Sequence, residues 1–190
     1  MPAHSKRLPD LAFGLCFTSL LVAAAVVYVH YRQRYIGGTD SFGYYELGHL
    51  FARGRIHLPL AAAVADSPAA IPLGFGPSPG GAIPLYPPGY PLLLAVASWF
   101  GLEFFVTPLV GIVSIVLLYR TAREFAGRWP ALAVAALWAF LPIVLFGATY
   151  VMSDLVAAVP LLGSYLLYRR ERPRASALLL VTCSPEAEAV

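Results

Sequence analysis

The chain has 190 residues, of which 59% are hydrophobic and 12% are charged, and its mean hydropathy is +0.72. Soluble domains carry about twice that share of charge, and several apolar runs reach the roughly 20 residues that a helix needs to cross a bilayer. This composition excludes a soluble globular protein and indicates an integral membrane protein. The formal charge of +3 comes from arginines at the ends of apolar runs, so it reports membrane orientation and gives no support to nucleic-acid binding.

The first apolar run covers residues 11–31 and is long enough to cross a bilayer. Small residues at 23–25 resemble a signal-peptide cleavage site, so a cleavable signal peptide is the alternative interpretation. The run is longer than a usual signal core and continues through Val26, Val27 and Tyr28. These features favour an uncleaved membrane helix.

A long loop, residues 32–88, follows the first run and opens with a helix signal. Asp40 stands at a helix-start position, and Gly54 stands where a helix would stop. Between them an apolar stripe recurs at helical spacing, and it consists of Tyr44, Leu47 and Phe51 with Tyr45 and Leu50 beside them. The pattern predicts an amphipathic helix that lies along the bilayer surface and holds the Asp40 carboxylate at the water–lipid boundary.

The second half of this loop, residues 61–88, is rich in alanine, proline and glycine. A loop of this length is either a functional lid or a floppy connector, and the sequence leaves both open. The segment Tyr-Pro-Pro-Gly-Tyr-Pro at 86–91 ends it. Because proline is tolerated in the first turn of a helix, the next helix is predicted to begin at about Pro91.

The arginines predict the membrane topology, because positive charge in short loops marks the cytoplasmic side. The arginines form two clusters, Arg120, Arg123 and Arg128, and Arg169, Arg170, Arg172 and Arg174. Two predicted helices, 130–149 and 151–168, lie between the clusters, so both clusters can be cytoplasmic. An inside N-terminus then places the long loop outside and allows a single crossing between 86 and 120. Residues 91–101 are therefore predicted to be a short, tilted or interfacial piece, and 104–122 a spanning helix.

The predicted fold class is thus all-α, with about four membrane crossings and a long outer loop, in a multi-pass protein of the plasma (inner) membrane. The turn at 150–154 faces outside, on the same side as Asp40. Residues 175–183 begin a further apolar run that 184–190 cannot continue into lipid. We therefore expect 1–183 to be the N-terminal part of a larger membrane domain that is cut short, followed by an irregular tail.

Three short motifs resemble the N-terminal part of the GT-C glycosyltransferases, which include the protein O-mannosyltransferases and the aminoarabinose transferases. They are Gly-Thr-Asp40 with Tyr44-Tyr45, the segment 86–94, and Met152-Ser153-Asp154 before an apolar helix. The resemblance spans about residues 8–175. It implies transfer of a sugar from a polyprenyl-phosphate donor to a lipid, glycan or protein acceptor at the outer face. It also implies that Asp40, in the first outer loop, and Asp154, at the outer end of a later helix, act at the catalytic centre.

The chemistry of such a transfer suits a carboxylate. A carboxylate within hydrogen-bond reach of the acceptor hydroxyl can act as general base, while the phosphate is already a competent leaving group. The departing phosphate needs cations, and Arg53 or Arg55 could fork onto its oxygens or bind lipid headgroups instead. Tyr44 and Tyr45 are further substrate-binding candidates by the resemblance.

Each of these residues has a structural alternative. Asp40 and Asp154 could simply cap the helices that follow them. Tyr86 and Tyr90 suit an aromatic belt at the membrane surface, or stacking on a sugar ring. His49 and His57 lack the spacing of metal ligands, so the sequence indicates no metal or other cofactor, although a divalent metal is compatible with it. Cys16 and Cys183 lie in apolar runs and define no disulfide framework.

Two other functions stay open beside the transferase. A transporter or flippase segment would move a lipid-linked substrate without making bonds, and a membrane scaffold would perform no chemistry. A transporter should carry ionisable groups or broken helices near the bilayer midplane, whereas the candidate acids here lie at the outer boundary, which favours an enzyme. We expect the 190-residue chain by itself to be too short for activity.

Overall fold

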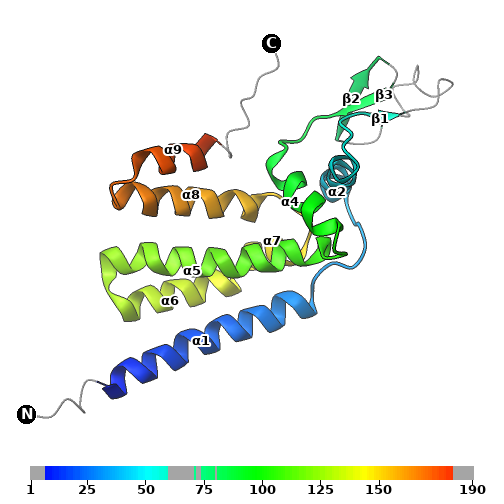
Figure 1. The fold of residues 1–190 in the computed structure, drawn as a ribbon. Helices are drawn as coiled ribbons and strands as arrows, with labels where there is room; N and C mark the ends of the chain where they lie inside the picture. Colours follow the sequence, from blue (N-terminus) through cyan, green and yellow to red (C-terminus); the bar gives the residue numbers. More distant parts are fainter. Residues whose placement is uncertain (1–6, 60–70, 72–73, 80, 182–190) are drawn as a thin grey trace, which may run out of the picture.

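The computed structural model describes residues 7–59, 71, 74–79 and 81–181. It is mostly helical, with 72% helix and 6% strand. Helix α5 (Val106–Ala126) lies at its centre and contacts the helices around it (Figure 1). These are α1 (Arg7–His30), α6 (Arg128–Phe140), α7 (Pro142–Thr149) and α8 (Asp154–Arg169), while α9 (Pro173–Val181) packs on α8.

Two helices in the described part of the chain are long and apolar enough to cross a membrane, Asp10–His30 and Glu103–Ala126. Helices α6 and α7 make a third candidate if they form one span, which is bent by 61°. Helix α8 has 16 residues, which at about 1.5 Å per residue gives roughly 24 Å, short of a hydrocarbon core of about 30 Å. The structure is therefore compatible with an integral membrane protein, but it does not confirm the four predicted crossings.

Small side chains let the apolar helices approach closely. Ala131, Ala135 and Ala139 recur every four residues along α6 and are fully buried. On α1, Ala24 and Tyr28 are fully buried in the same cluster. Helix α1 therefore runs unbroken through the small residues at 23–25, and one of its faces packs into the core.

The break between α6 and α7 has a cause in the sequence. Pro142 lacks a backbone N–H and disfavours helical geometry at the residue before it, and Leu141 is accordingly extended. The sequence predicted a single helix over 130–149 with a kink at this proline; the structure has two helices. The Tyr28 hydroxyl donates a 2.7 Å hydrogen bond to the Ala139 carbonyl and so satisfies an oxygen at the end of α6.

Tyr28→Phe removes this bond and leaves the Ala139 carbonyl unpaired in an apolar core. We expect the free energy of unfolding to fall by roughly 0.6–1.7 kcal/mol, the range for single polar contacts between membrane helices. Tyr119→Phe is the matched control, because Tyr119 is buried in the same cluster and, within the described residues, its hydroxyl makes no hydrogen bond. Equal thermal stability of the two variants in detergent would contradict the assignment.

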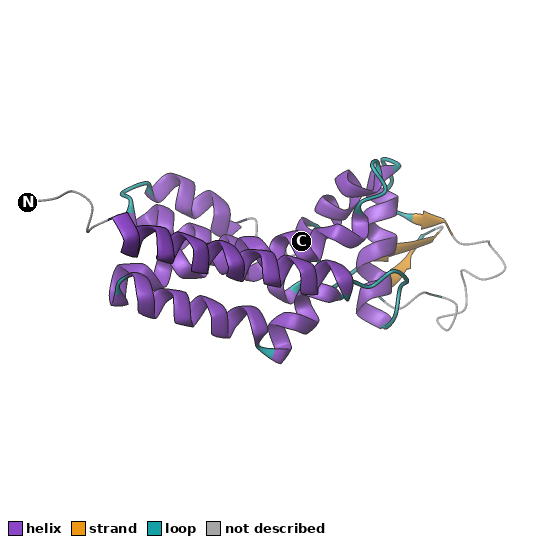
Figure 2. Cartoon of the chain, turned by 90° about the horizontal axis from the view of Figure 1, so that it is seen from below, coloured by secondary structure: helices purple, strands orange, loops and turns teal. Residues whose placement is uncertain are grey.

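The predicted long loop forms a separate layer at one end of the helices (Figure 2). It contains α2 (Thr39–Ala52) and a sheet of β1 (Leu58–Pro59), β2 (Phe75–Ser78) and β3 (Gly81–Pro84), followed by α4 (Gly89–Ser98) and the short η2 (Glu103–Phe105). The sheet is antiparallel in the order β1-β3-β2. The all-α prediction missed these strands because they are only two to four residues long and lack an alternating pattern.

Helix α2 itself is confirmed, and Gly54 follows its end with a positive φ of 67°. Its apolar residues Tyr44, Leu47 and Leu50 are buried, and the helix packs against α4. The short helix predicted near Pro91 is α4, which begins at Gly89. Two parts of the prediction lie outside the described residues. They are the centre of the proposed connector, at 60–70, 72–73 and 80, and the tail 184–190.

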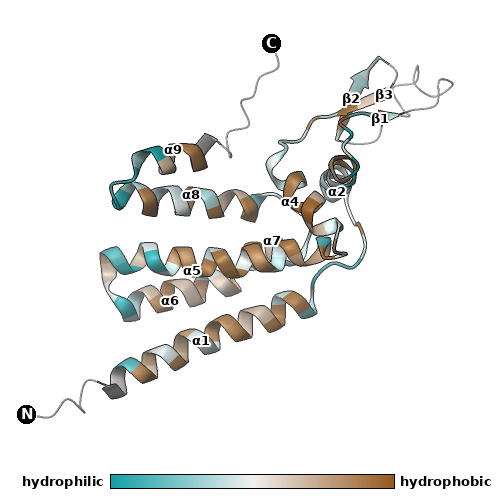
Figure 3. Cartoon of the chain, in the orientation of Figure 1, coloured by the Kyte–Doolittle hydropathy of each residue, from teal (hydrophilic) through white to brown (hydrophobic). Residues whose placement is uncertain are grey.

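Charged residues gather at the other end of the helices, at the α5–α6 and α8–α9 turns (Figure 3). Ion pairs tie that end together, with Arg128 bonded to Asp10 and Arg169 bonded to Glu124 at 3.2 Å. Both predicted arginine clusters therefore lie at the same end of the bundle. Asp40 and Asp154 lie at the opposite end, where α2 and α8 begin.

Candidate functional site

Tyr86 holds the Asp40 carboxylate. Its hydroxyl donates a 2.7 Å hydrogen bond to Oδ1 of Asp40, which lies exposed in the first turn of α2. The tyrosine ring passes so close to Gly43 and Gly74 that a Cβ at either position would lie 2.1 Å from a ring carbon. Glycine at these two positions is therefore what lets Tyr86 reach Asp40.

Neither aspartate acts as a helix cap. The N-cap of α2 is Gly38 and that of α8 is Ser153, and neither residue makes a side-chain capping bond. Within the described residues, the carboxylates of Asp40 and Asp154 accept no hydrogen bond from a backbone N–H. The capping interpretation is thus wrong for both. Each lies in the first turn of its helix, where the helix dipole favours negative charge.

Tyr44 connects the starts of the two helices. Its hydroxyl shares a 2.6 Å hydrogen bond with the Ser153 hydroxyl, and its ring packs on Tyr86 and Tyr90 at centroid distances of 4.3 and 5.3 Å. Burial raises the pKa of Tyr44; the Ser153 bond lowers it, and the charges of Asp40 and Asp154 raise it further. Tyr44 thus packs on Tyr86, the partner of Asp40, and bonds to Ser153, the residue before Asp154. These contacts bring the two acids, far apart in sequence, into one neighbourhood.

Gln33 fixes the loop that carries Ser153 and Asp154. Its backbone N–H donates to the Thr149 carbonyl at 2.7 Å, and its side-chain Oε1 accepts from the Val151 N–H at 3.0 Å. Gln33 is 7% exposed and Val151 is 1% exposed. The segment after α1 is therefore bonded to the segment before α8. Sequence reasoning missed Gln33 and the role of Ser153, because a lone polar residue gives no signal for a partner more than 100 residues away.

Tyr90 packs against the Tyr44 ring and is itself buried. It is 4% exposed, lies against Tyr44, and its hydroxyl has no hydrogen-bond partner among the described residues. Burial strongly raises the pKa of its phenol. Tyr45 lies apart, against His49 and Phe104, with ring centroids 4.3 and 5.8 Å away. Of the six predicted aromatic and acidic site residues, Tyr45 is thus separate. The other five form one cluster, Asp40, Tyr44, Tyr86, Tyr90 and Asp154, which Asp154 joins through its neighbour Ser153, the hydrogen-bond partner of Tyr44.

The two predicted phosphate-binding arginines lie elsewhere. Arg53 and Arg55 follow the C-terminal end of α2 and are exposed. The length of α2 separates them from Asp40 by roughly 20 Å along the helix axis. Arg55 lines a cavity of about 510 Å³ with Ile56, His57 and Pro59. Across residues 7–59, 71, 74–79 and 81–181, no three His, Cys, Asp or Glu side chains group as metal ligands.

A comparison of the chain with models of known protein families, with curated proteins and with solved structures gives no match. The function therefore has to be inferred from the site itself.

The position of Asp40 suits a general base at a water-exposed surface. One oxygen of Asp40 is held by Tyr86, and the side chain is exposed, so the second oxygen is free to accept a proton from a substrate hydroxyl. Burial, then the hydrogen bond to Asp40 and its charge, raise the pKa of Tyr86 to about 12. At neutral pH Tyr86 is therefore a permanent donor that orients the Asp40 carboxylate.

Gly43→Ala tests this contact. The added methyl group has to displace the Tyr86 ring and break its bond to Asp40, so the pKa of Tyr86 should fall from about 12 towards the usual value of about 10. The folded state of the wild type favours the neutral Tyr86 phenol. The stability that this preference contributes is present below about pH 10 and is lost as the pH rises through about 12.

The measurement is an ultraviolet titration of tyrosinate, with Tyr86→Phe as the difference reference. Gly14→Ala is the control, because a Cβ at Gly14 meets nothing within 4 Å. A Tyr86 that still ionises near its original pKa in Gly43→Ala would show that the ring is not wedged between the two glycines.

Proposed function

We propose that the chain belongs to an integral-membrane glycosyltransferase of the GT-C type, which moves a sugar from a polyprenyl-phosphate donor to an acceptor at the outer face. The observation that supports this is the position of both aspartates at one end of the helices. There Asp40 is exposed and oriented by Tyr86, and Asp154 follows Ser153, which bonds to Tyr44. The order of the motifs in the sequence supports the same family.

In this proposal Asp40 is the general base. The acceptor hydroxyl loses its proton to Asp40 as its oxygen bonds to the anomeric carbon of the sugar, and the bond from that carbon to the phosphate oxygen breaks. The polyprenyl phosphate leaves with the bonding electron pair and needs no strong general acid. Asp154, exposed at the start of α8, orients the acceptor by accepting a hydrogen bond from a second hydroxyl.

The proposed membrane arrangement follows from the charges. The arginine-rich end is cytoplasmic, which places the N-terminus inside and the aspartates outside. Helix α8 completes four crossings in a locally thinned bilayer, and α2 lies at the outer boundary beside α4. The roughly 20 Å between Asp40 and the arginines after α2 favours binding of lipid headgroups by Arg53 and Arg55.

A transporter of lipid-linked substrates is the second candidate, and the 61° bend between α6 and α7 is the observation that favours it. Transporters use such breaks to bind ions or substrates. Here the break is at Leu141 and Pro142, and a carbonyl beside it is already satisfied by Tyr28. The contacts at this break are therefore those of a structural kink.

The experiment that separates the two uses native membranes containing the protein as its gene encodes it, with radiolabelled undecaprenyl-phosphate hexose as the probe. A transferase moves the label from the prenyl phosphate onto a separate acceptor and releases unlabelled polyprenyl phosphate. Label that stays on the prenyl phosphate but changes leaflet would identify a flippase and overturn the proposal.

A further inference from the structure

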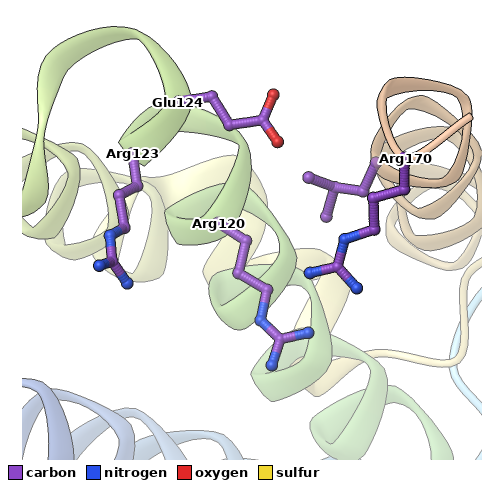
Figure 4. Close-up of a pocket in the computed structure, with 5 residues that line it drawn as sticks. Arg120, Arg123, Glu124 and Arg170 are labelled. Carbon is purple, nitrogen blue, oxygen red and sulfur yellow. The ribbon is translucent and has the colours of Figure 1, made fainter.

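A basic cavity lies between α5 and α8 at the arginine-rich end (Figure 4). It has a volume of about 430 Å³ and is lined by Arg120, Arg123, Glu124, Leu166 and Arg170. The guanidinium groups of Arg120 and Arg170 extend from their two helices toward the same space, as Figure 4 shows. Three of the five lining residues are thus cations, contributed by two helices.

The charge of this cavity is not balanced within the described residues. Glu124 is bonded to Arg169, and the nearby Arg128 is bonded to Asp10. In residues 7–59, 71, 74–79 and 81–181, the side chains of Arg120, Arg123 and Arg170 take part in no ion pair or hydrogen bond. Each guanidinium keeps five N–H donors available, and like charges that face one space repel unless an anion lies between them.

The surroundings of the cavity match a lipid better than a free ion. Its floor includes Leu166, which is 8% exposed. On the same two helices, close in sequence to Glu124 and Arg170, Phe125 and Tyr168 are 74% and 67% exposed. Aromatic side chains with this exposure, next to arginines at the end of apolar helices, are typical of the membrane interface. A phospholipid with its phosphate in the cavity could thus extend its acyl chains alongside the helices.

We propose that this cavity binds the phosphate headgroup of an anionic membrane phospholipid. Arg120 and Arg170 fork onto the phosphate oxygens from opposite helices, and Arg123 adds a third positive charge at the edge. The bound lipid links α8 to α5 at the end of the bundle opposite the aspartates. This site does not depend on the proposed transferase activity.

The test compares two double variants of equal charge in the full chain, reconstituted in phosphatidylcholine nanodiscs with phosphatidylglycerol as the probe. Arg120→Gln/Arg170→Gln removes the two converging guanidinium groups. Arg172→Gln/Arg174→Gln removes the same charge at exposed positions that do not line the cavity. We expect phosphatidylglycerol retained in native mass spectra to bind at least about tenfold more weakly in the first variant and within about twofold of wild type in the second.

Two further arms make the result decisive. Arg120→Lys/Arg170→Lys keeps the charge but loses the forked geometry, so binding should weaken several-fold while the fold is retained. Soluble glycerol phosphate, added to nanodiscs of phosphatidylcholine alone, should not compete at concentrations where the lipid binds. Equal losses in the two glutamine variants, no effect of the lysine variant, or equally tight binding of glycerol phosphate would each overturn the proposal.

Discussion

We expect Asp40→Asn to lower the rate of the proposed sugar transfer by about 10²–10⁴-fold, the range that a general base contributes. The amide keeps the size of the side chain and can still accept the Tyr86 hydrogen bond, but it cannot take a proton from the acceptor. The effect should fall on turnover rather than on the amount of protein in the membrane. The measurement is the initial rate of transfer from undecaprenyl-phosphate hexose in native membranes.

Glu46→Gln is the matched control for this variant. Glu46 lies on the same helix, and its substitution removes the same charge without touching the cluster of Asp40, Tyr44, Tyr86, Tyr90 and Asp154. Glu46 is half-buried, and within the described residues no hydrogen bond or ion pair joins it to these five residues. We therefore expect its rate to stay within about twofold of wild type. Unchanged turnover in Asp40→Asn, or equal losses in the two variants, would remove Asp40 from the chemistry.

Gln33→Met should destabilise the loop that positions Ser153 and Asp154. Methionine nearly conserves the side-chain volume but offers no strong acceptor, so the Val151 N–H is left buried and unpaired. Such a group costs about 1–3 kcal/mol, and the cost falls on the segment between Thr149 and Asp154. The free energy of unfolding should drop by that amount, and hydrogen exchange at Val151 should accelerate.

Gln33→Glu separates the lost acceptor from other effects of the substitution. A glutamate keeps an oxygen in the place of Oε1, so protection of the Val151 amide should be largely retained. Rapid exchange in both variants would show that the side-chain bond does not fix the loop. Slow exchange in Gln33→Met would show that the backbone bond from Gln33 to Thr149 is sufficient.

Local signals in the sequence predicted the main helices well. The length and hydropathy of the first run predicted α1, and an acidic start with a glycine stop predicted α2 between Asp40 and Gly54. Pro142 predicted the kink that separates α6 from α7. The arginine clusters predicted that the α5–α6 and α8–α9 turns lie at one end, and the ion pair of Arg169 with Glu124 ties them there.

The contacts that build the site depend on tertiary structure and could not be predicted. Tyr86 meets Asp40 from 46 residues away, and Tyr44 meets Ser153 from 109 residues away. No periodicity encodes such pairs. The start of α8 shows the same limit: it was predicted at residue 151, but Gln33 accepts the Val151 N–H, and the helix begins at Asp154.

The most direct test of the account is whether the two aspartates face the same side of the membrane. Three variants each carry a single cysteine, Asp40→Cys, Asp154→Cys or Arg172→Cys, in a Cys16→Ser/Cys183→Ser background. They are labelled in intact cells with a membrane-impermeant maleimide. We predict that positions 40 and 154 react without permeabilisation and that position 172 reacts only after it. Labelling of positions 40 and 154 from opposite sides would contradict the shared site and the sugar-transfer mechanism built on it.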